Sequence, residues 1–285
     1  MIDPHKLTEV VTAALREDAP DGDVTSSLVI PATATATAVL AAREQGVFAG
    51  ADVFAAAFTL TDDSVRVELM KHDGDAFGAG DVLARVTGNA RALLTAERIG
   101  LNFVQRMSGI ATLTRAYVDA IAGTHAVILD TRKTTPLLRE FERHAVVCGG
   151  ASNHRFSLSH AFMAKDNHLA VLTAGGKDIT TELQRVKHEL PSGMMFEVEV
   201  DRLDQIEPVL AGGVDVIMLD NFSLADLRTG VAQVAGRAKV EASGGVTLAT
   251  VADIARTGVD YISVGALTHS ARALDLGLDV TIDNA

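Results

Sequence analysis

Short apolar runs, each followed by a polar or glycine turn and then by a helical pattern, recur along the chain after about residue 108. Such strand–loop–helix units predict parallel strands joined by right-handed crossovers, as in a TIM-type barrel. The runs are almost continuously apolar, which is typical of strands buried on both faces of a sheet. They read AVILD, MMFEVEV, VDVIMLD, KVEA and VDYISV, and they end at Asp130, Val200, Asp220, Ala242 and Val264.

The first third of the chain mixes helical and strand patterns without this repeat. Apolar spacing predicts helices over 7–16 and 93–107, and a strand over 36–42. A polar stripe on the second helix carries Arg98, and it is either a solvated face or a side that reaches across an interface. The alternation within 274–282 predicts a late strand that returns to the N-terminal sheet. The whole pattern indicates an α/β protein.

Composition narrows the class of protein. Of 285 residues, 48% are apolar, which suffices for a sizeable core, and the formal charge is −12. That acidic balance argues against nucleic acid or an anionic membrane as a partner. The single cysteine, Cys148, cannot form a disulfide within the chain, so a reducing compartment fits best. No signal-peptide pattern and no apolar stretch of ~20 residues is found. The sequence therefore predicts a soluble cytoplasmic protein.

Six basic side chains gather between Val127 and His168, in the strings DTRKTTP, SNHR and KDNH. Fixed positive charges repel one another unless a ligand offsets them, so a cationic pocket predicts a strongly anionic small ligand. Taken singly, each of these residues is more often a surface charge or one partner of a salt bridge. Taken together at predicted strand ends, they suit a dicarboxylate or phosphate clamp. The six are Arg132, Lys133, His154, Arg155, Lys165 and His168.

Polar residues also follow the later predicted strands, where the active site of a barrel lies. Glu199 and Asp220 could hold a hydrated Mg²⁺ or bind ribose hydroxyls, and the simpler alternative is a charge pair with a nearby Lys or Arg. Glu197 competes with Glu199, because alternation points both to the same side of the strand. The loops 243–245 and 264–269 contain glycines that predict a phosphate cradle, although each alone could be a simple turn.

The histidines and the cysteine form no recognised metal motif. His144, His154, His160 and His168 lack HxH or HExxH spacing, and Cys148 has no partner cysteine. The string VVCGG is typical of a buried apolar position rather than a nucleophile. Neither a zinc site at these histidines nor a catalytic cysteine is therefore expected.

Together these motifs resemble the quinolinate phosphoribosyltransferase family, the carboxylating nicotinate-nucleotide diphosphorylases of NAD biosynthesis. The resemblance runs from LREDAPDGDVTS (15–26) through AERIGLNFVQRMSGIAT (96–112) to SVGALTHS (263–270). Its most specific part is DTRKTTP with NHR and KDNH at this spacing. The resemblance implies an N-terminal α/β sandwich domain over 1–108, joined by a C-terminal strand within 274–285. It also implies an incomplete TIM-like α/β barrel over 109–273 that carries the catalytic site.

The activity implied by the resemblance uses 5-phosphoribosyl 1-diphosphate, quinolinate and Mg²⁺, and gives nicotinate mononucleotide, CO2 and pyrophosphate. The family works as a homodimer with shared active sites, which leaves assembly into a hexamer open. The implied quinolinate-binding residues are Arg132, His154, Arg155 and Lys165, with Arg98 of the partner subunit. Lys133 would face the pyrophosphate, and Glu199 and Asp220 would hold ribose hydroxyls and Mg²⁺. Lys133, Lys165, Glu199 and Asp220 form the implied catalytic set. The 5′-phosphate would lie against Ser243, Gly244, Gly245, Val264 and Gly265, with His269 nearby.

The chain departs from the usual family pattern at four positions that affect loop shape and packing behind the ligand-binding residues. Leu137 and Ala151 stand where glycine is usual, His160 where aspartate is common, and Ala164 where a larger aliphatic residue is usual. Three other interpretations stay open. One is the fold-sharing group associated with molybdenum transport genes, which the intact KDNH disfavours. The others are a non-catalytic barrel that binds phosphorylated metabolites and a zinc-dependent barrel hydrolase.

Overall fold

The computed structural model describes residues 2–284, which form two compact units. The first unit combines the chain up to Arg115 with 135–150 and the residues from Ser270 onward. The second combines 116–134 with 151–269. Each unit has its own sheet, one antiparallel and one parallel, so the predicted α/β class is confirmed.

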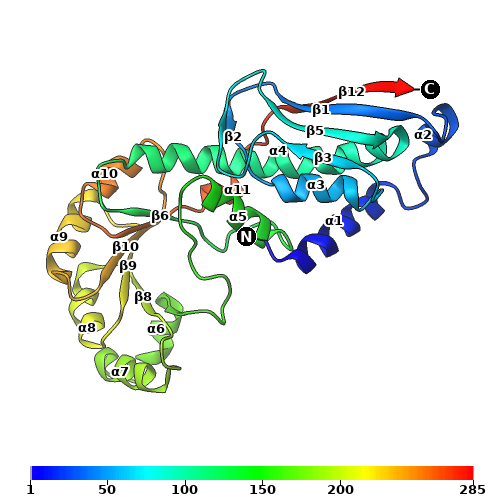
Figure 1. The fold of residues 1–285 in the computed structure, drawn as a ribbon. Coiled ribbons are helices and arrows are strands. Elements are labelled where there is room, and N and C mark those ends of the chain that lie inside the picture. The colour runs from blue at the N-terminus through cyan, green and yellow to red at the C-terminus, as the bar shows by residue number, and fades with distance from the viewer. Residues whose placement is uncertain (1, 285) are drawn as a thin grey trace. The chain divides into compact units, whose positions relative to one another are not determined.

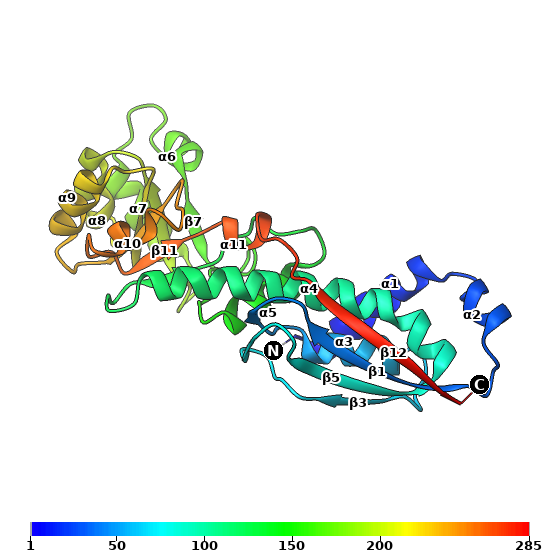
Figure 2. The ribbon, with the colours of Figure 1, turned by 90° about the horizontal axis from the view of Figure 1, so that it is seen from above.

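The first unit is built on a four-stranded antiparallel sheet of order β12-β1-β5-β3. Strand β12 runs along β1 with Ala38 opposite Val280, which confirms the late strand expected from the alternation (Figure 2). A separate two-stranded ladder joins β2 and β4. The strands are β1 (Thr35–Ala42), β2 (Gly46–Val47), β3 (Arg66–Leu69), β4 (Ala76–Phe77), β5 (Val82–Asn89) and β12 (Leu276–Asn284).

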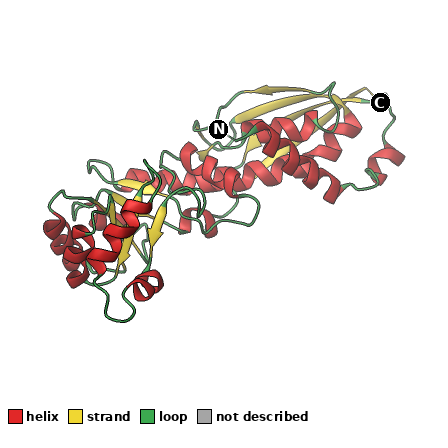
Figure 3. Ribbon diagram, turned by 90° about the horizontal axis from the view of Figure 1, so that it is seen from below, coloured by secondary structure: helices red, strands yellow, loops and turns green. Residues whose placement is uncertain are grey.

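Helices cover one face of this sheet (Figures 1 and 3). They are α1 (Pro4–Asp18), α3 (Ala51–Thr59) and the first part of α4 (Ala90–Ala120), and α1 and α4 contain the two predicted helices. Gly100 lets α4 come close to α3, since an added Cβ would lie 3.2 Å from the rings of Phe54 and Phe58. The unit also contains α2 (Val24–Val29) and α5 (Arg139–Cys148).

The second unit is built on six parallel strands of order β6-β11-β10-β9-β8-β7. Within residues 2–284 the two edge strands do not pair with each other, so the sheet is open, in agreement with an incomplete barrel. Apolar runs predicted five of these strands, whereas β7 has only three residues and was not singled out. The strands are β6 (Val127–Leu129), β7 (Phe162–Ala164), β8 (Phe196–Val200), β9 (Val216–Asp220), β10 (Lys239–Ser243) and β11 (Tyr261–Ser263).

Crossover helices lie on the outside of this sheet (Figure 1). They are α6 (Asp166–Leu172), α7 (Ile179–Glu189), α8 (Ile206–Ala211), α9 (Leu224–Val234) and α10 (Val251–Ala255). The short α11 (Ala266–His269) follows β11, the last of the six strands along the chain, and is not a crossover. No helix among the described residues combines the length and the apolar character needed to span a membrane.

Candidate active site

A cavity of about 550 Å³ in the second unit is lined by residues at the carboxyl ends of all six parallel strands. This position is where ligands bind in parallel α/β sheets, because side chains from several strand ends converge there. Ten residues predicted from the sequence line it: Arg132, Lys133, His154, Arg155, Lys165, Glu199, Asp220, Ser243, Gly244 and Gly245.

Four predicted site residues do not line the cavity. Val264 is buried, and Gly265 and His269 lie beside Lys133. An added Cβ at Gly265 would lie 3.0 Å from Cδ of Lys133 and 3.1 Å from Nε2 of His269. Arg98 is an exposed residue of α4 in the first unit, so its predicted role toward a partner subunit stays a prediction.

Beneath the cavity, His154 is held between two buried carboxylates. Its Nε2 lies 3.3 Å from Oε2 of Glu197 and 3.4 Å from Oε2 of Glu241. The hydroxyl of Ser263 donates to Glu241, and the amide of His154 donates to Oδ1 of Asp130 at 2.7 Å. Every one of these side chains except that of His154 is almost fully buried. The histidine is therefore fixed in place by charge and by its own backbone.

Two effects act on the charge of His154 in opposite directions. Burial lowers its pKa, but hydrogen bonds and charge attraction from Glu197 and Glu241 outweigh burial and raise that pKa to about 10. The amide of Arg155 lies 2.7 Å from Nδ1 and donates to it, which favours an unprotonated Nδ1. The hydrogen bond from the Arg155 amide contributes about 1 kcal/mol, whereas burying the carboxylates of Glu197 and Glu241 without a cation between them would cost several kcal/mol. The second effect is the larger. We therefore assign a raised pKa to His154, with a proton on Nε2 in either case.

The cationic side chains crowd together above this cluster. Burial, and then the like charge of Arg132, lower the pKa of Arg155. The Nη1 of Arg155 donates to the carbonyl of Ala161 at 3.1 Å, which fixes the guanidinium. A bound anion would relieve this repulsion, and the role of these residues as a clamp stays a prediction.

Glu199 and Asp220 differ in their surroundings. Glu199 forms an ion pair with Lys165, which is the charge-pair alternative raised by the sequence. Asp220 accepts a hydrogen bond from Nδ2 of Asn221 at 2.7 Å. Both carboxylates line the same cavity, and Mg²⁺ takes few protein ligands because it keeps water and substrate phosphates. The pair therefore fits a hydrated Mg²⁺.

The sequence analysis did not single out several residues of the cavity wall. Met163, Met218, Asn221 and Ser263 line the cavity beside Thr131 of the DTRKTTP string, and Glu241 lies below it. Glu241 could have been found, since a carboxylate inside the apolar run KVEA needs a buried partner. Glu199 and Glu241 both lie opposite Met218 on the strand between them, which brings the two strands' carboxylates to one side of the sheet.

His168 does not line the cavity. Its Nδ1 accepts the amide of Lys165 at 3.1 Å, and His168 thereby shapes the start of α6. The KDNH string thus has one residue in the cavity and one that orients it.

Comparison with known proteins agrees with this geometry. The family model for the quinolinate phosphoribosyl transferase N-terminal domain matches residues 23–108, and that for the C-terminal domain matches 110–279. The nicotinate-nucleotide pyrophosphorylase [carboxylating] of Mycobacterium leprae (strain TN) is 43% identical over 280 residues, covering 95% of this chain and 96% of that protein. The probable enzyme of the same name from Bacillus subtilis (strain 168) is 39% identical over 279 residues, with coverage of 98% and 95%.

Solved structures give the same result. The crystal structure of NadC from Streptococcus pyogenes has a TM-score of 0.94 and 40% sequence identity, and covers 99% of both chains. The structure of the nicotinate-nucleotide pyrophosphorylase from Francisella tularensis has a TM-score of 0.92 and 35% identity, with 99% of this chain and 98% of that chain covered. With both family domains matched and relatives about 40% identical over nearly their whole length, the chain belongs to the quinolinate phosphoribosyltransferase family.

Proposed function

We propose that this chain transfers the phosphoribosyl group of 5-phosphoribosyl 1-diphosphate to quinolinate and releases CO2, giving nicotinate mononucleotide and pyrophosphate for NAD biosynthesis. The observation that carries the proposal is the cavity at the parallel strand ends, where Arg132, Arg155 and two lysines lie with the carboxylates Glu199 and Asp220. This set complements a dicarboxylate on one side and a ribose with its phosphates on the other.

The clamp supplies orientation. Arg132, Arg155 and Lys165 are proposed to hold the carboxylates of quinolinate, which leaves its ring nitrogen facing C1 of the ribose. His154 is proposed to support the clamp from beneath rather than to bind the substrate directly, because its Nε2 points to Glu197 and Glu241 and the amide of Arg155 lies against its Nδ1. The bidentate hydrogen bonds to the substrate carboxylates are then proposed to come from Arg132 and Arg155.

The first chemical step forms a bond between the quinolinate nitrogen and C1 of the ribose, while the C1–oxygen bond breaks and its electron pair leaves with pyrophosphate. Lys133 is proposed to stabilise the charge on that leaving group. Bound Mg²⁺ would neutralise pyrophosphate charge, and Glu199 and Asp220 would hold it or the ribose hydroxyls. The loop from Ser243 to Gly245 and the neighbouring Val264 and Gly265, with His269, are the proposed contacts of the 5′-phosphate.

The second step is loss of the 2-carboxylate. The C2–carboxylate bond breaks and CO2 leaves. The bonding electron pair stays at C2, where the adjacent cationic ring nitrogen stabilises its charge, and C2 then takes a proton from solvent. Since the substrate supplies this electron sink, the step needs no general-base dyad from the protein. A site of fixed cations fits this requirement.

We further propose a homodimer whose active sites are completed by Arg98 of the partner subunit. Its exposure on α4 supports this role, as do the exposed apolar side chains Val24, Leu28 and Val29 of α2, which a partner would cover. Further assembly into hexamers is compatible with such a dimer. The single cysteine supports a reducing, cytoplasmic location.

The decisive test mixes purified protein with quinolinate, 5-phosphoribosyl 1-diphosphate and Mg²⁺, and follows nicotinate mononucleotide and CO2. Parallel reactions replace quinolinate by nicotinate or replace Mg²⁺ by a chelator. We expect product only from quinolinate with Mg²⁺. Thermal stabilisation by both ligands without any product would instead support a non-catalytic binding protein.

A further inference from the structure

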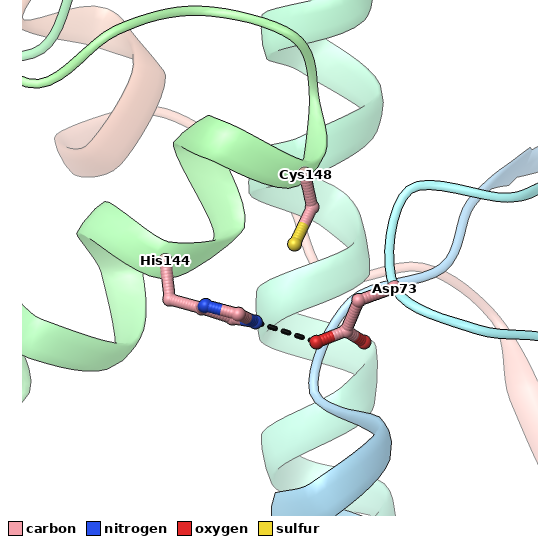
Figure 4. Close-up of side chains that lie close together, drawn as sticks. All are labelled: Asp73, His144 and Cys148. Carbon is pink, nitrogen blue, oxygen red and sulfur yellow. Dashed lines mark hydrogen bonds and ion pairs between the residues drawn. The ribbon is translucent and has the colours of Figure 1, made fainter. Parts of the chain in front are cut away.

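Three potential metal ligands from distant parts of the chain meet in the first unit, and none of them lines the strand-end cavity of the second. One donor atom from each of Asp73, His144 and Cys148 lies within 4.8 Å of the others (Figure 4). His144 Nε2 is 2.5 Å from Oδ2 of Asp73, and the sulfur of Cys148 points toward the pair from the end of α5. The proposed reaction uses none of these side chains.

The local structure fixes all three side chains. His144 and Cys148 are four residues apart in α5, so they lie on the same face one turn apart. Asp73 lies in the turn between β3 and β4, and its Oδ1 accepts the amides of Gly50 and Ala51 at 2.8 and 2.9 Å. Those two hydrogen bonds hold one carboxylate oxygen and leave the other directed at the histidine. Such support of a ligating carboxylate is a regular feature of metal sites.

We propose that Asp73, His144 and Cys148 form a binding site for a single divalent transition-metal ion of the Zn²⁺ type. One oxygen, one nitrogen and one sulfur are three of the four ligands that Zn²⁺ takes, and water would occupy the fourth position. With bonds of ~2.0–2.1 Å, the Nε2–Oδ2 separation would widen to roughly 3.3 Å in a tetrahedral site. For these two atoms the required movement is under ~1 Å, and the sulfur, which lies within 4.8 Å of them, would move closer by side-chain rotation.

The proton balance is compatible with binding. The proton between Nε2 and Oδ2 must leave that position, and it can move to Nδ1 of His144, which is buried and has no hydrogen-bond partner among the described residues. The thiol proton of Cys148 passes to solvent. Burial and the charge of Asp73 raise the pKa of Cys148 to about 12, so the free thiol is protonated and inert at neutral pH. A bound dication reverses this balance because it stabilises the thiolate.

The donor set also gives selectivity. A thiolate and an imidazole favour Zn²⁺, Co²⁺ or Cu²⁺ over Mg²⁺, which prefers oxygen ligands. The site is thus chemically distinct from the pair Glu199 and Asp220. The sequence argued against such a site because it contains no known motif, and Asp73 lies 71 residues before His144. Only the fold brings the three together.

Binding would tie α5 to the turn between β3 and β4. Both elements belong to the first unit, so the ion would act as a cross-link within it. We therefore expect Zn²⁺ to raise the melting temperature of the protein, in line with ligand binding to the folded state only.

The test is a Co²⁺ titration of tag-free, chelator-treated protein, followed by the thiolate-to-Co²⁺ absorption in the near ultraviolet. Because Cys148 is the only cysteine, this band reports on one sulfur alone. We expect saturation at one equivalent, displacement by Zn²⁺ and no competition from excess Mg²⁺. The variants His144→Ala and Asp73→Asn should each bind at least ~10-fold more weakly.

The matched control is His72→Ala, which removes an exposed imidazole in the same turn that lies 3.9 Å from the carboxylate of Asp75. It should leave the Co²⁺ affinity unchanged. Absence of the band in wild-type protein at large Co²⁺ excess would overturn the proposal. A band of unchanged affinity in His144→Ala would overturn it as well, because the thiol would then bind without its proposed partners. Wild-type titration alone is decisive if a variant fails to fold.

Discussion

At the scale of single residues, Arg132 is expected to contribute most directly to substrate recognition. Arg132→Ala should raise KM for quinolinate by roughly 30- to 150-fold, because a hydrogen-bonded charge contact contributes about 2–3 kcal/mol. KM for 5-phosphoribosyl 1-diphosphate and the melting temperature should change little. Steady-state kinetics with each substrate varied in turn checks this expectation. Arg228→Ala on the exposed face of α9 is the control, and near-wild-type kinetics in Arg132→Ala would remove this residue from the clamp.

The cluster beneath the cavity makes stability depend on pH. Although burial lowers it, Glu197 and Glu241 raise the pKa of His154 to about 10, above the unfolded value of ~6.5. A raised pKa contributes stability that is fully present below the unfolded pKa and is lost as pH rises through the folded pKa. Glu241→Gln should therefore destabilise the protein by ~1–3 kcal/mol at pH 6 and by less near pH 10.

Urea unfolding of both proteins at pH 6 and pH 10 measures this difference. The control is Glu207→Gln, which breaks an exposed pair with Arg237. Its small effect should be the same at both pH values, because neither partner titrates in this window. An equal effect of Glu241→Gln at both pH values would contradict the assigned charge state of His154.

A substitution at Gly244 tests the close approach between the loop after β10 and Asn221. The φ of Gly244 is +94°, and an added Cβ would lie 2.2 Å from Oδ1 of Asn221, the residue that also holds Asp220. Gly244→Ala should therefore lower the free energy of unfolding by ~1 kcal/mol for its backbone conformation and by ~1–3 kcal/mol more for the clash. Gly245→Ala, with φ +59° and no atom within 4 Å of its added Cβ, should show only the first part. Equal unfolding free energies for the two variants would argue against the close approach.

The sequence predicted that a polar residue belongs to the site when that residue stands at the end of an apolar run. Arg132 and Asp220 were found in this way, whereas Lys165 was found through the KDNH string, and all three line the cavity. Glu241 was missed because it lies inside its strand, two residues before the end. Leu137 was recognised as unusual, and its φ of 68° shows why: the backbone there keeps the left-handed conformation that favours glycine.

At the scale of elements, periodicity predicted long helices and apolar strands well. The helix expected over 93–107 is only the middle of α4, which extends from Ala90 to Ala120 because no proline interrupts it. Strand β7 has three residues, too few for a pattern to establish itself. The order of the strands depends on contacts that periodicity does not encode. Which residues meet around the cavity was therefore known only from the structure.

Close packing over α4 gives a prediction at this scale. An added Cβ at Gly109 would lie 1.9 Å from the carbonyl oxygen of Arg272, in the segment that leads to β12. Gly109→Ala should destabilise the protein by at least ~2 kcal/mol, although alanine improves helix propensity by about 1 kcal/mol. Gly100→Ala in the same helix meets only the rings of Phe54 and Phe58 at 3.2 Å and should be milder. Thermal unfolding compares the two variants, and a stable Gly109→Ala protein would contradict the contact.

At the scale of the whole molecule, subunit mixing tests the proposed shared active sites. Arg98→Ala and Arg132→Ala proteins should each be nearly inactive at quinolinate concentrations below the wild-type KM. When the two are mixed and allowed to exchange subunits, half of the dimers become mixed, and each of these has one intact site of two. Activity should therefore recover to about a quarter of the wild-type value. No recovery after verified exchange would place Arg98 and Arg132 in the same subunit's site, or would remove Arg98 from it.

The pairing of β12 with β1 has a consequence during protein synthesis. Strand β1 receives this neighbour from a segment roughly 240 residues later in the chain, since Ala38 pairs with Val280. At ~5–20 residues per second, the ribosome needs on the order of 12–50 s to make the missing strand. For that time one edge of β1 stays open, and open edges recruit strands from other chains. Nascent chains that stall before residue 276 should therefore be prone to aggregate and to depend on chaperones.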